Sequence, residues 1–211
     1  MCSKYTNFLF DLDGTLVDSF GDIQSSLEKA YQLVLGREVV VQRNLIGPPL
    51  GAMIDSLTPA ITTDEKNTLI RAYRTDYDSS MYDRTTEMTG AFDLLHWLHR
   101  QDKQLFLVTN KSYKPTQRIL SKFNISLFKD VMSPDKFEGK HYSKTELIQF
   151  LIDTYCLNLQ ETVMLGDTRH DVIAAKACAI DSICISGGYD DYESLKKENP
   201  TYIIDKIFQL K

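Results

Sequence analysis

Asp11-Leu-Asp-Gly-Thr-Leu-Val-Asp18 is the stretch that decides the fold, and it directly follows the apolar run Phe8-Leu-Phe10. The apolar run predicts a buried strand, and the glycine after Asp13 predicts a turn where this strand ends. Side chains two positions apart in a strand share one face, so Asp11 and Asp13 would both look out of the carboxyl edge of a sheet. Carboxylate oxygens suit Mg²⁺, and an aspartate can attack phosphorus. The stretch therefore predicts metal-assisted phosphoryl transfer, with a solvated Asp-Gly turn as the alternative.

The composition is that of an ordinary globular protein with one domain, or a core with an inserted module. The chain has 211 residues, of which 43% are apolar and 25% charged, and a net charge of −5 without a basic block, which argues against nucleic acid as a partner. No apolar run approaches the roughly 18–20 residues of a membrane span, and no signal segment is evident, so we expect a cytoplasmic protein without a membrane partner. The cysteines at 2, 156, 178 and 184 have no metal-type spacing and predict reduced thiols.

Short apolar runs alternate with helical stretches along most of the chain. This alternation predicts βαβ units and an α/β fold with a Rossmann-like, doubly wound parallel sheet. The predicted strands are Asn7–Phe10, Gln104–Thr109, Val131–Ser133, Val163–Gly166, Ser182–Ile185 and Tyr202–Ile204. The predicted helices between them are Ala91–Arg100, Pro115–Phe123, Lys144–Tyr155 and Asp171–Ala179.

One interval is too long for a simple crossover between strands. Apolar residues at helical spacing over 23–35, and a second helical stretch over 62–81, lie between the first and second predicted strands. We therefore expect an inserted helical cap over 18–85, with 1–17 and 86–211 forming the core. A decorated single domain without independent movement is the alternative.

Polar residues also follow two other predicted strands. Thr109 and Asn110 bring a hydroxyl and an amide to the sheet edge, where they could hold phosphate oxygens, although such a strand end is commonly a plain turn. Asp167 ends a further strand, and Asp171 follows four residues later on the first helical turn, so both acids lie on one side. Asp167 can then reach a metal directly and Asp171 can support it, whereas helix capping by Asp is the simpler reading.

A lysine is expected near the start of the next helix. Ser143-Lys-Thr-Glu146 matches the capping-box pattern S-x-x-E, which makes Lys144 the first helical residue. A lysine at this end opposes the helix dipole unless an anion lies nearby. The pattern favours Lys144 over its neighbour Lys140 as the cation of the site, and Lys140 stays open as the alternative.

Taken together, these residues resemble the four motifs of the haloacid dehalogenase superfamily phosphatases, in the phosphoglycolate phosphatase-like branch. The motifs occur in order along nearly the whole chain. The resemblance implies that Asp11 is the nucleophile that forms an aspartyl-phosphate, and that Asp13 is first the general acid and then the general base. It also implies a Mg²⁺ cofactor held by the Asp11 side chain, the backbone carbonyl of Asp13 and Asp167, with Asp171 in support.

The same resemblance implies the remaining contacts. Thr109 and Asn110 would bind phosphoryl oxygens, and Lys144 would bridge Asp11 and the phosphate. The insertion resembles a C1-type cap whose loop at 44–51 closes over the substrate. Beyond the resemblance, Arg43 beside this loop could meet a second anionic group, with a solvent-facing arginine as the alternative. This chain lacks the Lys-Pro pair of many relatives at the third motif, which keeps the choice between Lys144 and Lys140 open.

The function implied is Mg²⁺-dependent hydrolysis of a small phosphorylated metabolite. A phosphomutase of the β-phosphoglucomutase type, or a pyrophosphatase or 5′-nucleotidase, would use the same core. A non-catalytic binding protein is a further alternative, but this chain keeps both Asp11 and Asp13. The identity of the phosphate ester, and the choice between monomer and homodimer, stay open from the sequence.

Overall fold

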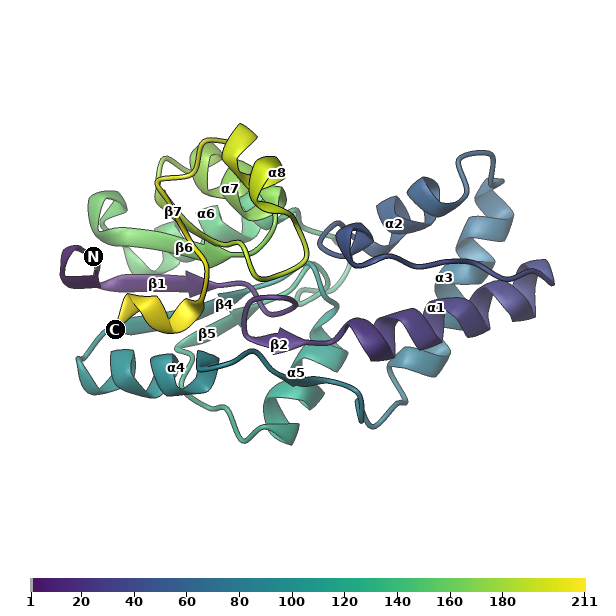
Figure 1. Cartoon of the computed structure of the whole chain (residues 1–211), viewed down its shortest axis with the longest axis horizontal. Coiled ribbons are helices and arrows are strands. Elements are labelled where there is room, and N and C mark those ends of the chain that lie inside the picture. Colours follow the sequence, from purple (N-terminus) through teal and green to yellow (C-terminus); the bar gives the residue numbers. More distant parts are fainter. Residues whose placement is uncertain (1) are drawn as a thin grey trace.

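The protein is described here by a computed structural model that covers residues 2–211, so that Met1 and the side chain of Cys2, one of the four predicted thiols, lie outside the described part. Within that part, six parallel strands form one sheet in the order β5-β4-β1-β6-β7-β8 (Figure 1). The strands are β1 (Asn7–Phe10), β4 (Gln104–Val108), β5 (Asp130–Met132), β6 (Thr162–Gly166), β7 (Asp181–Ile185) and β8 (Tyr202–Ile204). Counted along the chain, this is the 3-2-1-4-5-6 order of a doubly wound fold, which confirms the predicted fold class.

Helices cover both faces of the sheet because its central strand is apolar on both faces. Phe8 and Phe10 of β1 belong to one hydrophobic cluster, which also holds buried residues of α4 (Ala91–Arg100) and α5 (Tyr113–Lys122). Leu9 points the other way, into a cluster with α6 (Lys144–Tyr155) and α7 (Arg169–Ala177). This two-sided burial explains why the strands read as continuous apolar runs rather than alternating ones.

Three helices form a cap inserted between β1 and β4. They are α1 (Phe20–Leu35), α2 (Leu50–Leu57) and α3 (Thr63–Tyr77), and Figure 1 shows them beyond the end toward which the β1 arrow points. The two connections to the core lie side by side, because β2 (Val17–Asp18) pairs antiparallel with β3 (Thr86–Glu87). The cap therefore stands over the carboxyl edge of the sheet, where a ligand of this fold would lie.

Two helices were not predicted. The Gly and Pro content of residues 44–51 predicts a loop, yet α2 begins at Leu50 within this stretch. Pro49 directly precedes the helix, a position where proline is tolerated because no backbone donor is needed. The short α8 (Tyr192–Lys197) begins at the capping residue Asp191 and lies near the C-terminus. Among residues 2–211, no helix is long and apolar enough to cross a membrane. Cys178 and Cys184 are buried and Cys156 is exposed, all as free thiols.

Candidate active site

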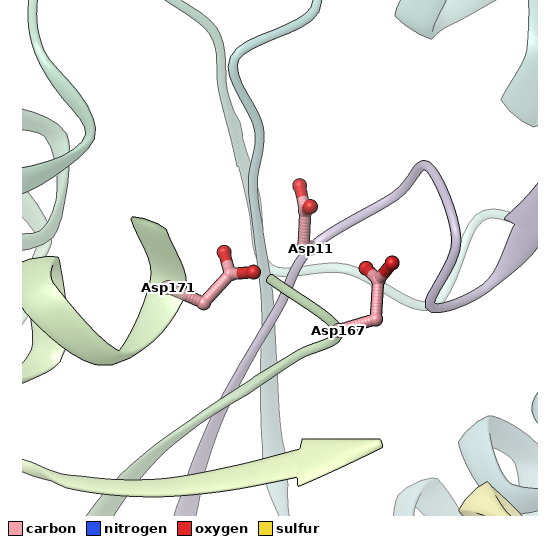
Figure 2. Close-up of side chains that lie close together, drawn as sticks. All are labelled: Asp11, Asp167 and Asp171. Carbon is pink, nitrogen blue, oxygen red and sulfur yellow. The ribbon is translucent and has the colours of Figure 1, made fainter. Parts of the chain in front are cut away.

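The site begins where β1 and β6 end next to each other. The two strands pair in register, Phe10 beside Leu165, and the backbone N–H of Asp11 donates to the Leu165 carbonyl at 2.8 Å. Asp167 follows β6 directly, so the ends of these strands bring Asp11 and Asp167 together at the switch point of the sheet. Figure 2 shows Asp11, Asp167 and Asp171 around one space, and one ligand oxygen from each lies within 4.8 Å of the others. All three side chains are buried.

Asp167 is held in place by groups from two loops. Its carboxylate accepts a hydrogen bond from the Thr15 hydroxyl at 2.8 Å and another from the backbone N–H of Tyr189 at 2.7 Å. Gly14 has a φ of +80°, and a Cβ at this position would lie 2.0 Å from Asp167 Oδ2. The glycine of the opening stretch is thus required both for its backbone conformation and for the space that Asp167 occupies.

Asp171 both caps a helix and reaches the site. Its Oδ2 accepts from the backbone N–H of Thr168 at 3.0 Å and from the Thr168 hydroxyl at 2.8 Å, which closes the first turn of α7. Its other oxygen, Oδ1, lies 2.6 Å from Lys144 Nζ. A Cβ on Gly166 would lie 2.1 Å from Asp171 Cγ, so the close approach depends on this glycine. The capping role considered from the sequence and the site position therefore coexist.

Lys144, rather than Lys140, lies in the site. Ser143 and Glu146 form the predicted capping box and start α6 at Lys144, which confirms this local prediction. Lys144 Nζ is 3.0 Å from Asp11 Oδ1, and the lysine side chain is only 5% exposed. Lys140 is 58% exposed and pairs with Glu146 at 3.1 Å on the surface. The structure thus places one buried ammonium group within ion-pair distance of two of the three buried carboxylates, Asp11 and Asp171.

These charges perturb one another because water is excluded. Burial raises the pKa of Asp11 to about 7, and the negative charges of Asp171 and Asp13 add to the effect, while Lys144 opposes it. Burial, followed by the charges of Asp11 and Asp171, also holds the pKa of Asp167 well above its usual value. For Lys144, burial lowers the pKa, but Asp11 and Asp171 more than compensate and raise it overall. Negative charge is therefore in excess, and a set of carboxylate oxygens fits a hard divalent cation such as Mg²⁺.

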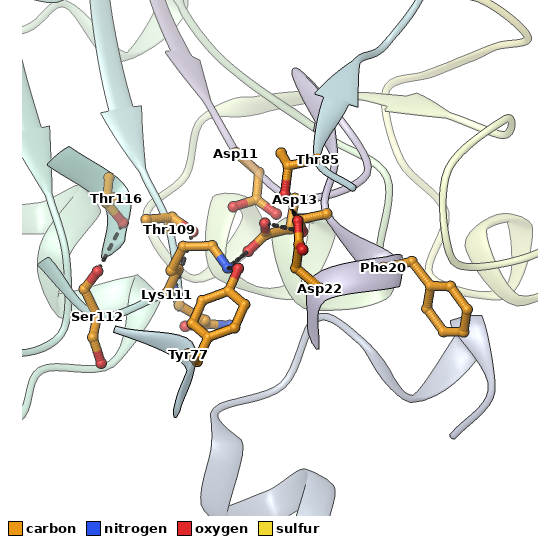
Figure 3. A network of polar contacts seen from close by, with 12 residues as sticks. Asp11, Asp13, Phe20, Asp22, Tyr77, Thr85, Thr109, Lys111, Ser112 and Thr116 are labelled. Carbon is orange, nitrogen blue, oxygen red and sulfur yellow. Dashed lines mark hydrogen bonds and ion pairs between the residues drawn. The ribbon is translucent and has the colours of Figure 1, made fainter. Parts of the chain in front are cut away.

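Asp13 belongs to a second polar network that the sequence did not predict. The Ser19 hydroxyl donates to Asp13 Oδ1. Lys111 Nζ lies 3.1 Å from Asp13 Oδ2 (Figure 3). Lys111 also donates to the hydroxyl of Tyr77, on the cap helix α3, at 2.7 Å. Lys111 stands directly after the Thr-Asn pair, so its position was a usable signal, but its cap partner is more than thirty residues away in the sequence. This network joins Asp13 in the core to the cap.

Thr109 and Asn110 lie at the end of β4, beside Asp11. Thr109 is buried, its backbone N–H donates to the Met132 carbonyl at 3.0 Å, and its hydroxyl accepts from the Lys111 backbone N–H at 3.2 Å. Asn110 instead donates its side-chain N–H to the Gly47 carbonyl of the cap loop at 2.7 Å. A Cβ on Gly47 would lie 2.8 Å from Thr168 Cγ2, so this loop also touches the core at α7. Asn110 therefore holds the cap loop in this arrangement.

A cavity lies between the core residues and the cap. Its empty volume is about 600 Å³, including the part open to solvent, and its lining includes Asp11, Asp13, Lys111, Tyr73 and Arg74. The predicted Arg43 does not line this cavity. Its guanidinium pairs with Asp18 at 2.7 Å and lies over the Phe20 ring. The position of Arg43 therefore gives no support to the second-anion contact expected of it.

Similarity to known proteins agrees with this geometry. A family model described as haloacid dehalogenase-like hydrolase matches residues 8–185. A phosphoglycolate phosphatase of Pseudomonas fluorescens is 30% identical over 209 residues, which cover 94% of this chain and 76% of that protein. A phosphoglycolate phosphatase of Photobacterium profundum is 29% identical, covering 95% and 92% of the two chains. A crystal structure of a predicted phosphatase from Clostridium acetobutylicum superimposes with a TM-score of 0.89 at 26% identity, covering 98% of this chain and 96% of that one. The chain therefore belongs to the haloacid dehalogenase-like hydrolases, as a phosphatase similar to their phosphoglycolate phosphatases.

Proposed function

We propose that this protein hydrolyses a small phosphate monoester with Mg²⁺ and through an aspartyl-phosphate on Asp11. One observation carries the proposal: the carboxylate of Asp11 is buried within 4.8 Å of the oxygens of Asp167 and Asp171, with a lysine ammonium 3.0 Å away. A carboxylate placed in this way has both partners for a metal and a fixed positive charge close by. This arrangement supports nucleophilic attack on phosphorus rather than a purely structural ion pair.

In the first step, an Asp11 oxygen forms a bond to phosphorus while the ester P–O bond breaks. The leaving oxygen takes a proton from Asp13, whose carboxylate is positioned by Ser19 and Lys111. In the second step, water attacks phosphorus and gives its proton to Asp13, while the bond between phosphorus and Asp11 breaks. Phosphate is released and both carboxyl groups return to their starting states.

The charged groups around Asp11 divide the remaining work. Lys144 would stabilise the negative charge that gathers on the phosphoryl oxygens, because its ammonium is fixed in place before the substrate binds. Mg²⁺ would be held by Asp11, the backbone carbonyl of Asp13 and Asp167, with Asp171 in support, and when bound it supplies positive charge that polarises the phosphoryl group. Thr109, directly after β4, would donate a hydrogen bond to a phosphoryl oxygen.

The proposal includes the domain division and the location of the protein. Residues 18–85 would form a mobile cap and 1–17 and 86–211 the core, with a hinge at β2 and β3. The pairing of these two strands supports this division, because both connections pass through one narrow ribbon. The free thiols at 156, 178 and 184 are compatible with a cytoplasmic location.

The experiment is a comparison of the wild-type protein with Asp11→Asn, using p-nitrophenyl phosphate with Mg²⁺ and with EDTA. We expect turnover by the wild type only with Mg²⁺, and background turnover by Asp11→Asn. Brief reaction with labelled acetyl phosphate followed by denaturation should leave label on the Asp11 peptide of the wild type alone. The proposal is wrong if wild-type turnover with Mg²⁺ does not exceed that of Asp11→Asn.

A further inference from the structure

Arg74 is a charged residue of the cavity to which the phosphatase chemistry gives no role. It lies in the last turn of α3 and lines the cavity together with Asp11 and Asp13 of the core. Its neighbours on α3, Tyr73 and Tyr77, line the same cavity, and their rings are stacked with centroids 5.1 Å apart. Arg74 thus lines the cavity from the cap, whereas the reacting phosphate would lie beside Asp11 of the core.

The two lysine ammonium groups near this space each lie beside a carboxyl group. Lys144 pairs with Asp11 and Asp171, and Lys111 lies 3.1 Å from Asp13. In the part of the chain that the structure describes, Arg74 has no carboxylate within ion-pair distance.

The guanidinium of Arg74 also lacks local hydrogen bonds. Its Nε is buried and finds no hydrogen-bond partner among residues 2–211. A buried donor without a partner is unfavourable, and a charged donor more so, which makes the position favourable for an anion that supplies the missing acceptor. A guanidinium presents its donors as a planar fork that matches a carboxylate or a phosphate.

We propose that Arg74 is a specificity-determining residue that binds a second anionic group on the substrate, at the end opposite to the reacting phosphate. The proposal rests on the proposed phosphatase function. It defines the substrate class as small phosphate esters that carry a carboxylate or another phosphate. The walls contributed by Ile46, Leu50 and Met53 are apolar and would pack against the short carbon chain between the two anionic ends.

A simpler role for Arg74 is available and gives a different result. A basic residue in the last turn of a helix stabilises the helix dipole, and Arg74 also acts electrostatically on Asp78 nearby. A residue with only this role would affect all substrates alike when it is replaced. The test therefore compares esters that differ in one charged group and are otherwise matched.

Two pairs of esters serve as probes, each with Mg²⁺: phosphoglycolate against 2-hydroxyethyl phosphate, and glucose 1,6-bisphosphate against glucose 1-phosphate. The wild type should prefer the member with the second anionic group in at least one pair. A preference within the first pair indicates that Arg74 binds a carboxylate, and a preference within the second pair indicates that it binds a phosphate. Arg74→Gln should lower kcat/KM for that member by about ten- to a hundredfold, mainly through KM, the loss expected for a charged hydrogen bond. Its kcat/KM for the ester that lacks the second anionic group should stay within about threefold.

Two further variants complete the test. Arg74→Lys should recover part of the loss, because the charge is kept while the fork is not. Arg71→Gln is the matched control, since Arg71 is exposed on the same helix and donates to Thr68, and it should behave as the wild type. Equal losses on both members of each pair, or a wild type that prefers the esters without the second anionic group, would overturn the role of Arg74 while leaving the phosphatase function intact. Failure of the wild type to hydrolyse any ester with Mg²⁺ would instead overturn the phosphatase function itself.

Discussion

Replacement of Lys144 by methionine removes the one ammonium group that touches both Asp11 and Asp171 and keeps an apolar side chain of similar length. The two contacts are 3.0 Å and 2.6 Å long, and each corresponds to a gross attraction of about 5–6 kcal/mol at an effective dielectric constant of about 20. Desolvation of the lysine offsets much of this attraction. Breaking a buried pair still costs about 3–5 kcal/mol, because the carboxylates that remain are uncompensated.

Two consequences follow for Lys144→Met. A loss of this size should lower the metal-free thermal midpoint by roughly 6–20 °C, since 1 kcal/mol corresponds to about 2–4 °C in a chain of this length. The loss of a fixed positive charge at the reacting phosphate should lower kcat by about 10²–10³-fold. Added Mg²⁺ should stabilise the variant more than it stabilises the wild type, because the site then holds more uncompensated negative charge.

The assay measures thermal unfolding with EDTA and with MgCl₂, and turnover of p-nitrophenyl phosphate by the variants that remain folded. Lys140→Met is the matched control. Lys140 is 58% exposed and pairs with Glu146 on the surface, so the thermal midpoint and activity of this variant should stay near those of the wild type. The reasoning is refuted if Lys144→Met keeps wild-type activity and midpoint, or if Lys140→Met alone loses activity.

Three further outcomes are expected. Removal of metal with EDTA should lower the thermal midpoint of the wild type, and Mg²⁺ at about 100 times its Kd should restore roughly 2.7 kcal/mol, whereas no shift on titration would argue against a divalent site. Gly166→Ala should lose most activity, because its Cβ would lie 2.1 Å from Asp171 Cγ; full activity would show that Asp171 can move without consequence. Burial raises the pKa of Asp18, but hydrogen bonds from Arg43, the Phe20 backbone N–H and the Tyr189 hydroxyl, together with the charge of Arg43, outweigh burial and lower this pKa below 3.8. Asp18→Asn should therefore destabilise the protein at neutral pH. This stabilisation is present above pH 3.8 and is lost as the pH falls through the lowered pKa, so the midpoints of wild type and variant should converge as the pH falls below 3.8; a gap independent of pH would contradict the assignment.

The parts of the fold that the sequence predicted are those specified by local patterns. The six sheet strands are apolar runs that end in turn residues, and Ser143 and Glu146 form the capping box that starts α6. Both features could therefore be predicted from the sequence pattern. The helix α2 was missed because the glycines and prolines of residues 44–51, which overlap its start, suit a loop equally well. Its formation depends on burial of Met53 and Ile54 against the rest of the cap, which a single-sequence pattern does not contain.

The candidate site divides in the same way. Asp11, Asp13, Asp167 and Asp171 follow strand ends, where parallel topology brings them to a single edge of the sheet, so their proximity was predictable. The contacts between cap and core could not be predicted, because they join segments that are far apart in the sequence and share no local sequence pattern. Lys111 meets Tyr77, and Asn110 meets Gly47, across distances of 34 and 63 residues in the sequence.

The hydrogen bond between Asn110 and Gly47 shows that the cap contacts the core through different groups from those that line the cavity. The cap offers a main-chain carbonyl to Asn110, and at Gly47 it rests on Thr168 without a side chain of its own. The contact of the cap with the core at Gly47 thus depends on the backbone of the loop, whereas side chains such as Tyr73 and Arg74 line the cavity. We therefore expect that exchange of Tyr73 and Arg74 changes which esters bind, while the contacts of Gly47 with Asn110 and Thr168 stay the same. An engineered library should vary Tyr73 and Arg74 and leave Tyr77 and residues 46–49 unchanged.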